Sequence, residues 1–339
     1  MKKIRLGRTD LEISRIGMGG IPLQRPSEEN AVKLIKYALD QGINLIDTSR
    51  HYGTSEERIG KALKGRRDEV VLITRQSLMD GMTAKKNLQQ SLATLQTDYI
   101  DVWEFHNVGK EKYENLLKPG SAFDIAKQAQ KEGKIKHIGI TSHCFETMEK
   151  AIISENFDVV LFPFNFVNNE AADSLIPLAK KLDIGFTSMK PFAGGRLQNA
   201  SLVMKYLMQF DDVIPVPGFE KIEEIEEVVK IVEGNYKLST EEMHQINLVK
   251  KDLGKKFCQW CGYCMPSCPQ DIYIPGVINL KVSYNLWPQG DFVANYQEEV
   301  NKAKKCIECR ICESKCPYSL ETVNLLKKGI DFFDKVAQL

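Results

Sequence analysis

Two cysteine runs near the C-terminal end of the sequence constrain this chain more than any other feature. The first run contains Cys258, Cys261, Cys264 and Cys268 and is followed by Pro269. The second run contains Cys306, Cys309, Cys312 and Cys316 and is followed by Pro317. Both runs have the spacing C-x2-C-x2-C-x3-C-P, which is the ligand spacing of proteins that bind two [4Fe-4S] clusters.

The same spacing predicts which thiolates share a cluster. Three cysteines on one tight turn can reach neighbouring corners of one cluster, while the fourth lies beyond the turn and serves the other cluster. The expected ligands are therefore Cys258, Cys261, Cys264 and Cys316 for cluster 1, and Cys306, Cys309, Cys312 and Cys268 for cluster 2. Structural zinc is the alternative, because C-x2-C pairs also form four-cysteine zinc sites, although zinc rarely uses three cysteines in one such run.

The distribution of cysteine divides the 339-residue chain into two parts. Residues 1–257 contain only Cys144, whereas the rest of the chain contains eight cysteines. This contrast, and a length beyond that of one ordinary core, predicts a first domain over 1–236, a linking helix over 237–254 and a second domain over 255–339. Thiols grouped at metal spacing, rather than spread as a disulfide framework, indicate a reducing cytoplasm and an anaerobic or microaerobic organism.

The charge balance excludes two classes of partner. Lysine and arginine total 46 against 45 aspartate and glutamate residues, which leaves a net charge of +1. Such a balance offers no electrostatic basis for binding nucleic acid or an anionic membrane. No run of eighteen apolar residues occurs, and no apolar stretch follows the charged start, so we expect a soluble cytoplasmic protein without a membrane span.

Eight short apolar segments recur through the first 220 residues, at 16–20, 44–49, 70–75, 99–106, 137–142, 159–164, 184–191 and 213–218. Most are continuously apolar rather than alternating, which is typical of strands buried on both faces of a parallel sheet. Helical patterns lie between them, for instance at 28–40, 55–63, 84–95, 121–131, 146–154, 171–182 and 222–232. This α/β alternation favours a (β/α)8 TIM barrel over an open sheet, which usually has fewer strands.

Local signals refine this pattern at three places. Ser27 and Thr83 each precede a run of helix-forming residues and are expected to cap the helices that follow. The segment 4–16 alternates around a turn at Arg8, Thr9 and Asp10, so we expect a small hairpin that closes the bottom of the barrel.

Polar side chains occupy the ends of three consecutive predicted strands. The second strand ends near Asp47, with Tyr52 five residues further on, the third ends in Arg75, and the fourth ends in His106. Taken singly, each has an ordinary structural explanation as a turn cap, a loop anchor, a surface charge or a core histidine. Because the chemistry of a barrel lies at the C-terminal ends of its strands, their combination predicts an active site.

These residues carry a resemblance to a known family. The stretches DTSRHYGTSEE at 47–57, GKALKGRRDEVVLITR at 60–75 and DYIDVWEFH at 98–106 together resemble the aldo-keto reductase superfamily. More narrowly, the chain is similar to the microbial subgroup in which the barrel precedes a dicluster ferredoxin-like domain. The resemblance implies a (β/α)8 barrel that acts on a small carbonyl-type substrate and binds NAD(P)H across its top without a Rossmann fold.

By position, the resemblance implies that Asp47, Tyr52 and His106 are three of the four catalytic residues. The fourth position is lysine in the family and Arg75 here. In the family mechanism the tyrosine donates a proton to the carbonyl oxygen while hydride arrives at the carbon, and the Asp–Lys pair acidifies the phenol. Arg75 can supply positive charge, but its delocalised and forked guanidinium is not equivalent to a compact ammonium.

The resemblance also implies nucleotide contacts by Ser142, His143, Asn165, Met189, Lys190, Pro191, Phe192, Arg196, Gly218, Phe219 and Lys221. Several positions depart from the family pattern. Leu161 replaces a glutamine, Met189 replaces the ring that stacks on nicotinamide, and Glu220 and Glu224 stand where other side chains grip the adenosine phosphate. Because carboxylates repel a 2′-phosphate, the sequence does not favour NADP over NAD.

The second domain is expected to be small and mostly α-helical. Helical patterns cover 239–253, 277–286, 296–304 and 320–336, and they resemble the α-helical ferredoxin modules of multi-centre oxidoreductases. We expect the aromatic residues near the cysteines to form a dry shell around the clusters. These residues are Trp260, Tyr263, Tyr273, Trp287 and Tyr318.

Three functions are compatible with the sequence. The first is an oxidoreductase that reduces a carbonyl or related organic substrate in the barrel, with electrons passed through the clusters, a ferredoxin-like redox partner, NAD(P)H or a combination of these. The second is an electron-transfer protein whose barrel binds a partner or ligand and no longer reduces carbonyls. The third is an ordinary reductase whose clusters are structural or sensory.

Overall fold

The structure is a computed structural model that describes residues 1–77, 80–253, 256–286 and 292–338. The chain divides into two compact units, Met1–Met243 and His244–Leu339. The division falls within helix α10 (Thr240–Leu253), and the domain limits expected at 236 and 254 stay predictions.

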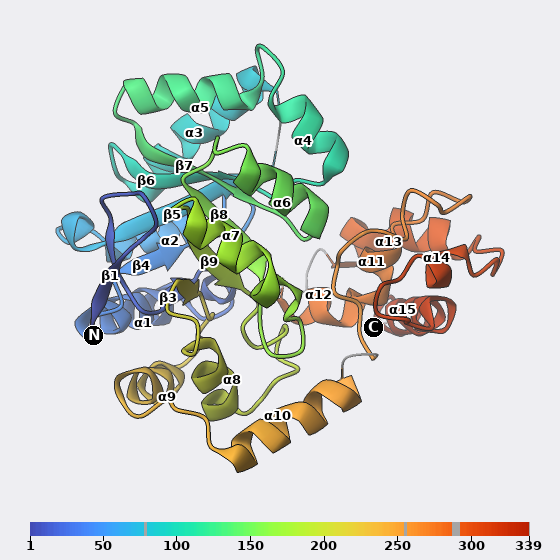
Figure 1. The fold of residues 1–339 in the computed structure, drawn as a ribbon. Helices are drawn as coiled ribbons and strands as arrows, with labels where there is room; N and C mark the ends of the chain where they lie inside the picture. The colour runs from blue at the N-terminus through green and yellow to red at the C-terminus, as the bar shows by residue number, and fades with distance from the viewer. Residues whose placement is uncertain (78–79, 254–255, 287–291, 339) are drawn as a thin grey trace. The chain divides into compact units, whose positions relative to one another are not determined.

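The first unit is a barrel of parallel strands, as the apolar segments predict. Its eight-stranded sheet has the order β10-β9-β8-β7-β6-β5-β4-β3 (Figure 1). The strands are β3 (Gly17–Gly19), β4 (Leu45–Asp47), β5 (Val71–Gln76), β6 (Ile100–Phe105), β7 (Ile135–Thr141), β8 (Val159–Pro163), β9 (Gly185–Met189) and β10 (Val213–Pro215). The two ends of the sheet meet where Gly19 forms a parallel bridge with Gly218, and the Gly19 N–H donates to the Pro217 carbonyl at 2.7 Å.

Helices alternate with these strands along the chain. They are α1 (Glu28–Asp40), α2 (Ser55–Ala62), α3 (Gly81–Leu95), α4 (Lys110–Leu116), α5 (Ala122–Lys131), α6 (Phe145–Ile153), α7 (Leu175–Lys181), α8 (Ala200–Leu207) and α9 (Ile222–Glu233), with the 3-10 helices η1 (Ile21–Gln24), η2 (Arg67–Glu69) and η3 (Glu170–Asp173). Figure 1 shows them around the strands of the barrel. This alternation of parallel strands and helices confirms the predicted (β/α)8 barrel.

Two local predictions in this unit were wrong. Ser27 caps α1 as expected, but α3 is capped by Asp80, whose side chain accepts from the N–H of Thr83, so Thr83 lies in the first turn rather than at the cap. The helix expected over 171–182 is interrupted at Ser174, between η3 and α7. Pro177 explains the interruption, because a proline lacks the backbone donor and its ring clashes with the preceding turn.

The predicted hairpin is present and fills one end of the barrel. Strands β1 (Lys3–Arg5) and β2 (Glu12–Ser14) pair antiparallel. Leu6, Leu11 and Ile13 of this segment are buried in one cluster with side chains from the barrel strands. At Gly7, which has a φ of 53°, a Cβ would lie 2.1 Å from the backbone nitrogen of Gly185, so the hairpin presses directly on the start of β9.

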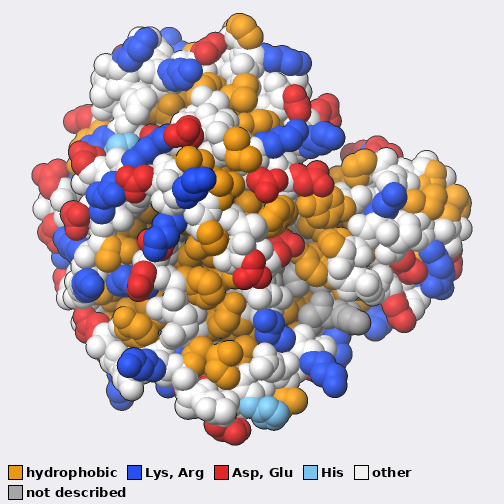
Figure 2. Space-filling model, viewed as in Figure 1, with side chains coloured by type: hydrophobic (Ala, Val, Ile, Leu, Met, Phe, Trp, Pro, Cys, Tyr) orange, Lys and Arg blue, Asp and Glu red, His pale blue; other side chains and the backbone are white. Residues whose placement is uncertain are grey.

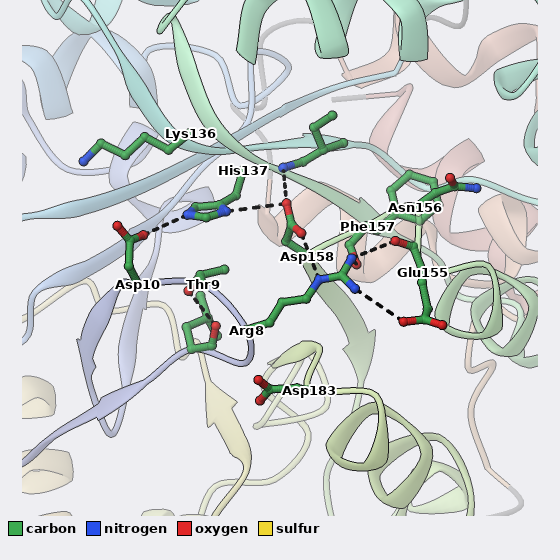
Figure 3. Close-up of polar contacts among 12 residues, drawn as sticks. Arg8, Thr9, Asp10, Lys136, His137, Glu155, Asn156, Phe157, Asp158 and Asp183 are labelled. Carbon is green, nitrogen blue, oxygen red and sulfur yellow. Dashed lines mark hydrogen bonds and ion pairs between the residues drawn. The ribbon is translucent and has the colours of Figure 1, made fainter. Parts of the chain in front are cut away.

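A polar network ties the turn of this hairpin to the barrel. Figure 3 shows the ring of His137 between the carboxylates of Asp10 and Asp158, with Arg8 between Asp158 and Glu155. His137 Nε2 lies 3.1 Å from Asp10 and its Nδ1 lies 3.5 Å from Asp158. Burial lowers the pKa of His137, but the hydrogen bonds to Asp158 and Asp10 raise it by more, so the pKa lies above its ordinary value.

This network predicts a pH-dependent contribution to stability. A histidine whose pKa is raised on folding contributes stability below its unfolded pKa of about 6.5, and this contribution is lost as pH rises through the folded pKa. We expect Asp10→Asn to lower the free energy of unfolding by at most about 1 kcal/mol in mildly acidic buffer. In alkaline buffer, where His137 is neutral, the variant and the wild type are expected to unfold alike.

Urea unfolding at two pH values measures this difference. Asp183→Asn is a matched control, because Asp183 also anchors the hairpin but pairs with Arg5, which does not titrate in this range. An equal loss of stability from Asp10→Asn at both pH values would show that His137 carries no charge in the folded protein.

The described part of the second unit is helical and contains no strand, as predicted. Its helices are α11 (Ile274–Ile278), α12 (Leu280–Leu286), α13 (Phe292–Ala303), α14 (Ile311–Ser314) and α15 (Thr322–Val336), with α10 leading into it. Val277, Phe292, Val300, Leu326 and Phe333 form its core. A Cβ at Gly329 would lie 2.1 Å from the carbonyl oxygen of Val277, so α11 and α15 cross with their backbones in close contact.

The surface agrees with the balanced composition. On the face of the molecule shown in Figure 2, lysine and arginine side chains are interspersed with aspartate and glutamate. Among the described residues, no helix is long and apolar enough to cross a membrane.

Candidate functional site

The four predicted catalytic residues lie at one end of the barrel. Asp47 is the last residue of β4, Tyr52 follows it in the loop before α2, Arg75 lies next to the end of β5, and His106 follows β6. Strands β4, β5 and β6 are parallel neighbours, so their C-terminal ends lie side by side. The sheet thereby brings together residues that are far apart in the sequence.

Arg75 is the centre of this group. Its Nη2 donates to the Asp47 carboxylate, and its Nη1 lies 3.4 Å from the Tyr52 hydroxyl. On the other side, its Nε forms an ion pair with Glu104 Oε2 at 3.0 Å. Asp47, Tyr52, Arg75 and Glu104 are all buried, with 7% exposure or less. The guanidinium therefore faces two carboxylates and one phenol away from solvent.

Glu104 is a member of this group that the sequence analysis missed. It lies in β6, which is buried at every position, and its own exposure is 0%. A neighbouring glycine leaves the space for it, because a Cβ at Gly139 in β7 would lie 2.7 Å from Glu104 Cγ. A charged residue within a fully buried strand, two positions before His106, was the signal in the sequence.

His106 faces the phenol as a neutral ring. Its centroid lies 5.8 Å from that of Tyr52 in an edge arrangement and 6.3 Å from that of His51 in a stacked one. Ser49 Oγ lies 3.4 Å from its Nδ1. Burial, and then the charge of Arg75, hold the pKa of His106 well below its ordinary value. A neutral imidazole can donate one hydrogen bond to a substrate oxygen beside the phenol.

The electrostatics of the group keep Tyr52 protonated at neutral pH. Burial raises the pKa of Tyr52 to about 12, and Asp47 and Glu104 raise it while Arg75 lowers it. Burial likewise raises the pKa of Glu104 to about 8, with Arg75 acting against it. At neutral pH the site therefore holds one phenol that can donate a proton and a second buried acid, Glu104.

The residues predicted to contact a nicotinamide already make contacts within the protein. The Ser142 hydroxyl donates to the Val108 carbonyl at 2.7 Å. The Asn165 amide donates to the Lys190 carbonyl at 2.9 Å, and its oxygen accepts from the backbone of the following turn. Leu161 is fully buried in the barrel core, where Met189 packs against it. The role of Ser142 and Asn165 as nicotinamide contacts stays a prediction.

Lys190 and His143 form a contact that the sequence did not indicate. Lys190 Nζ lies 2.9 Å from His143 Nε2, and His143 Nδ1 lies 3.0 Å from Asn107 Oδ1. Because an ammonium only donates, Nε2 accepts and the ring proton lies on Nδ1, which then donates to Asn107. Burial, and then the charge of Lys190, hold the pKa of His143 well below its ordinary value. The pair brings one positive charge to the C-terminal ends of β7 and β9.

The remaining predicted nucleotide contacts lie in the segments after β9 and β10. Pro191 and Phe219 are buried, Phe192 and Arg196 are half-buried, and Gly218 and Lys221 are exposed. Arg196 donates to the Ala193 carbonyl at 3.2 Å.

Two carboxylates occupy the segment after β10, where the adenosine end is expected. Glu224 accepts from the N–H groups of Glu220 and Lys221 at the start of α9, and Glu220 pairs with Arg25 at 2.9 Å. Carboxylates repel a 2′-phosphate. The nucleotide contacts expected in these segments stay predictions.

In the second unit, the two cysteine runs share left-handed residues at matched positions, although only the second run contains a helix, α14. Each position of the first run has a counterpart at a constant offset in the second. The residues before the two middle cysteines, Trp260 and Glu308, have φ values of 67° and 55°, and the residues after them, Gly262 and Arg310, have 80° and 56°. Left-handed conformation is uncommon for residues other than glycine, so its recurrence at matched positions shows the same local winding around the middle cysteine of both runs.

The repeat extends beyond the cysteines into the helices that follow. The N–H of Cys268 donates to Met265 and that of Cys316 to Glu313, at 3.0 and 3.2 Å. The residues that precede α11 and α15, Tyr273 and Glu321, have φ and ψ of −74° and 69° in one case and −72° and 71° in the other. The unit is therefore built from two copies of one cysteine-loop-and-helix motif.

The thiols of the runs lie near one another. Burial raises the pKa of Cys264 to about 12, and the neighbouring Cys258, Cys261 and Cys312 raise it further. Cys264, Cys268, Cys306 and Cys312 all pack against the apolar core of the unit. Within the described ranges, no group of three or more histidine, cysteine, aspartate or glutamate side chains is arranged to hold a single metal ion. The eight thiols in two matched loops nevertheless fit [4Fe-4S] clusters by donor type and number.

The dry aromatic shell expected around the clusters stays a prediction, and four of its five residues lie in the described part of the chain. Trp260 and Tyr273 have ring centroids 6.4 Å apart, and burial raises the pKa of Tyr273 to about 12. Tyr263 and Tyr318 are half-buried. Trp287 lies outside the described residues.

Comparison with known families agrees with the two-part organisation. Residues 15–203 match the Aldo/keto reductase family, and residues 257–321 match the 4Fe-4S dicluster domain, which includes both cysteine runs.

Similar sequences and structures belong to the same family as the barrel. Aldo-keto reductase YhdN of Bacillus subtilis is 30% identical over 63% of this chain and 68% of its own length. L-galactose dehydrogenase of Arabidopsis thaliana is 29% identical over 57% of this chain and 66% of its own length. The structure of aldo-keto reductase AKR11C1 from Bacillus halodurans superposes with a TM-score of 0.65 and 23% identity, covering 74% of this chain and 96% of that one.

An aldo-keto reductase from Klebsiella pneumoniae, solved in complex with NADPH, superposes with a TM-score of 0.63 and 22% identity, covering 74% of this chain and 95% of that one. The family match, the related sequences and the barrel architecture lead to one conclusion. This chain is an oxidoreductase that belongs to the aldo/keto reductase family and carries a 4Fe-4S dicluster domain.

Proposed function

We propose that the barrel reduces a carbonyl or related organic substrate, with electrons passed through two [4Fe-4S] clusters, NAD(P)H or both. The observation that carries this proposal is the group formed by Asp47, Tyr52, Arg75 and His106 at the C-terminal ends of neighbouring strands. A phenol beside a fixed cation and a neutral imidazole is suited to protonating a carbonyl oxygen.

Each of the four residues has its own role in the proposed reduction. Tyr52 donates its proton to the substrate oxygen, and His106 donates a hydrogen bond that orients that oxygen. Arg75 stabilises the phenolate that Tyr52 leaves behind, and Asp47 holds Arg75 in place. Reduction of a carbonyl to an alcohol consumes two electrons and two protons. Tyr52 supplies one proton, so the site requires a reductant for the two electrons and a source of the second proton. A hydride donor carries that proton equivalent itself, and solvent supplies the proton when the clusters supply the electrons.

The second unit offers ligands for the one-electron carriers. We propose that Cys258, Cys261, Cys264 and Cys316 hold one cluster and that Cys306, Cys309, Cys312 and Cys268 hold the other. The left-handed residues at matched positions support two equivalent cluster sites, and the crossed assignment of the fourth cysteines rests on the ligand spacing of the runs. Bound [4Fe-4S] clusters transfer single electrons, which a ferredoxin-like redox protein can supply.

The Klebsiella pneumoniae structures, which contain NADP or NADPH, support a nucleotide as the other reductant. Among the predicted nucleotide contacts, Lys190, Arg196 and Lys221 are cationic side chains suited to a pyrophosphate. Glu220 and Glu224 favour a nucleotide without a 2′-phosphate.

A second candidate function has its own support. The guanidinium of Arg75 is paired with two carboxylates, and the pKa of Tyr52 is raised to about 12, which is unfavourable for an acid catalyst. These features favour a barrel that binds a ligand or a partner and no longer reduces carbonyls, while the clusters transfer electrons.

Arg75→Lys separates the two functions. Lysine restores the compact charge that acidifies the phenol, so a carbonyl reductase is expected to keep or increase its rate. A barrel whose binding site depends on Arg75 holding both Asp47 and Glu104 is expected to lose ligand binding or electron exchange, because a lysine ammonium does not reproduce the forked geometry that pairs with both carboxylates. Steady-state rates with a panel of aldehydes, and electron exchange with reduced ferredoxin, measure both properties.

Arg75→Met is the control for the loss of positive charge at this position, because methionine is neutral. This variant leaves Asp47 and Glu104 without their cation, so unfolding midpoint and iron content are measured beside activity. A lysine variant that is folded, iron-loaded and without reductase activity would contradict the proposed function.

A further inference from the structure

Glu104 is a buried carboxylate that the proposed function does not use. Its side chain enters the barrel from β6, is 0% exposed and pairs with Arg75 Nε at 3.0 Å. The opposite edge of the same guanidinium holds Asp47 and faces Tyr52. One cation thus stands between two carboxylates and the phenol.

The net charge of this group affects the acidity of the Tyr52 phenol. If Asp47 and Glu104 are both ionised, they exceed the charge of Arg75 by one negative unit before Tyr52 loses a proton. Arginine cannot lose its own proton, so it cannot relieve this excess or return a proton to the phenolate. If Glu104 carries a proton, Asp47 alone balances Arg75, and a phenolate adds the first excess charge.

We propose that Glu104 is a positioning residue whose proton controls how much of the positive charge of Arg75 is available to Tyr52. When Glu104 is protonated, Arg75 stabilises the phenolate more strongly and Tyr52 donates its proton more readily. When Glu104 is ionised, its negative charge makes proton donation by Tyr52 less favourable. The inference rests on the proposed function for its effect on catalysis, but not for its effect on the phenol itself.

The surroundings of Glu104 support a role for its protonation. The charged groups that act on it are Arg75 from β5 and Asp47 from β4, and Tyr52 is the further titratable group in the cluster. On the β7 side it meets Gly139, which has no side chain. Burial raises the pKa of Glu104 to about 8, so the switch between its two forms falls in an accessible range of pH.

Glu104→Gln tests the proposal, because glutamine keeps the shape and removes the charge. In the holoprotein, wild-type activity is expected to fall as pH rises through about 8, and Glu104→Gln is expected to retain its activity there. Asp101→Asn is the matched control. Asp101 is a buried carboxylate of the same strand, but it pairs with Arg67 and Lys136, so its variant is expected to keep the wild-type profile.

A second readout does not depend on activity. A ring-fluorinated tyrosine, whose phenol is more acidic, is placed at position 52, and its ionisation is followed by fluorine NMR. Glu104→Gln is expected to lower the pKa of this phenol by about one unit, the effect of removing one nearby like charge. If this shift appears in a protein that reduces no carbonyl, the inference holds and the proposed function fails.

An unchanged phenol pKa in folded Glu104→Gln would overturn the inference, whatever the activity. Should this variant not fold, infrared difference spectra of the wild type supply the test. A buried carboxylic acid that loses its proton near pH 8 is expected, and its absence would also overturn the inference.

Discussion

Tyr52→Phe is expected to lower the rate of carbonyl reduction by about 10²- to 10⁴-fold, the usual contribution of a positioned proton donor. The substitution removes only the hydroxyl, which lies 3.4 Å from Arg75 Nη1, and leaves the buried ring in place. Fold and iron content are therefore expected to stay unchanged. Steady-state rates measured anaerobically, with circular dichroism and iron analysis beside them, test this result.

Tyr113→Phe is a closely matched control. Tyr113 in α4 is also buried, with 8% exposure, and its hydroxyl lies 3.4 Å from the Lys150 carbonyl, away from the catalytic group. Its loss is expected to leave the rate as in the wild type. Equal rates for Tyr52→Phe and the wild type would point to a barrel that does not reduce carbonyls.

Substitution of the fourth cysteine of either run is expected to remove one cluster. Wild-type protein prepared anaerobically is expected to hold about eight iron and eight sulfide per chain, four of each per cluster. Cys268→Ala is expected to deplete the cluster held by the run of Cys306, because the fourth ligand crosses between the runs. Cys316→Ala is expected to deplete the other cluster. Electron paramagnetic resonance of each reduced variant identifies the signal that is lost.

Cys144→Ala is the control for this experiment, because Cys144 precedes helix α6 of the barrel and lies outside both runs. It is expected to retain all the iron. Loss of the Cys258 cluster from Cys268→Ala, with the other cluster intact, would show that each run binds its own cluster. Stoichiometric zinc without visible absorption would exclude the clusters altogether.

The barrel could be predicted from sequence because its strands are buried on both faces. Residues 159–164 and 213–218 read as continuous apolar segments, and they form β8 and β10 at the expected places. The errors had local causes. Pro177 explains the break at Ser174 that divides the expected helix into η3 and α7, and Asp80 caps α3 ahead of Thr83.

The candidate site was predictable only where its residues follow strand ends. Asp47, Arg75 and His106 mark three consecutive ends, so their convergence follows from the fold. Glu104 lies within a strand, and its role depends on the space left by Gly139 in the next strand. The contact of Lys190 with His143 joins the ends of β9 and β7, which have β8 between them, and no local pattern indicates such a pair.

The backbone conformation of the cysteine runs also could not be predicted from the sequence. The spacing of the cysteines predicted two equivalent runs, but not that their loops share left-handed residues at matched positions. Trp260, Glu308 and Arg310 have side chains that disfavour this conformation, so sequence propensity argues against the backbone that the structure has.

A single-turnover experiment tests the central claim most directly, that the barrel reduces a carbonyl group with electrons supplied to this chain. Anaerobic holoprotein is loaded with electrons by chemical reduction, or mixed with NADH or NADPH, and then given an aldehyde. The account predicts that the wild type forms the alcohol from at least one of these electron sources and that Tyr52→Phe forms it about 10²- to 10⁴-fold more slowly. No alcohol from any source, or equal rates of alcohol formation by both proteins, would contradict it.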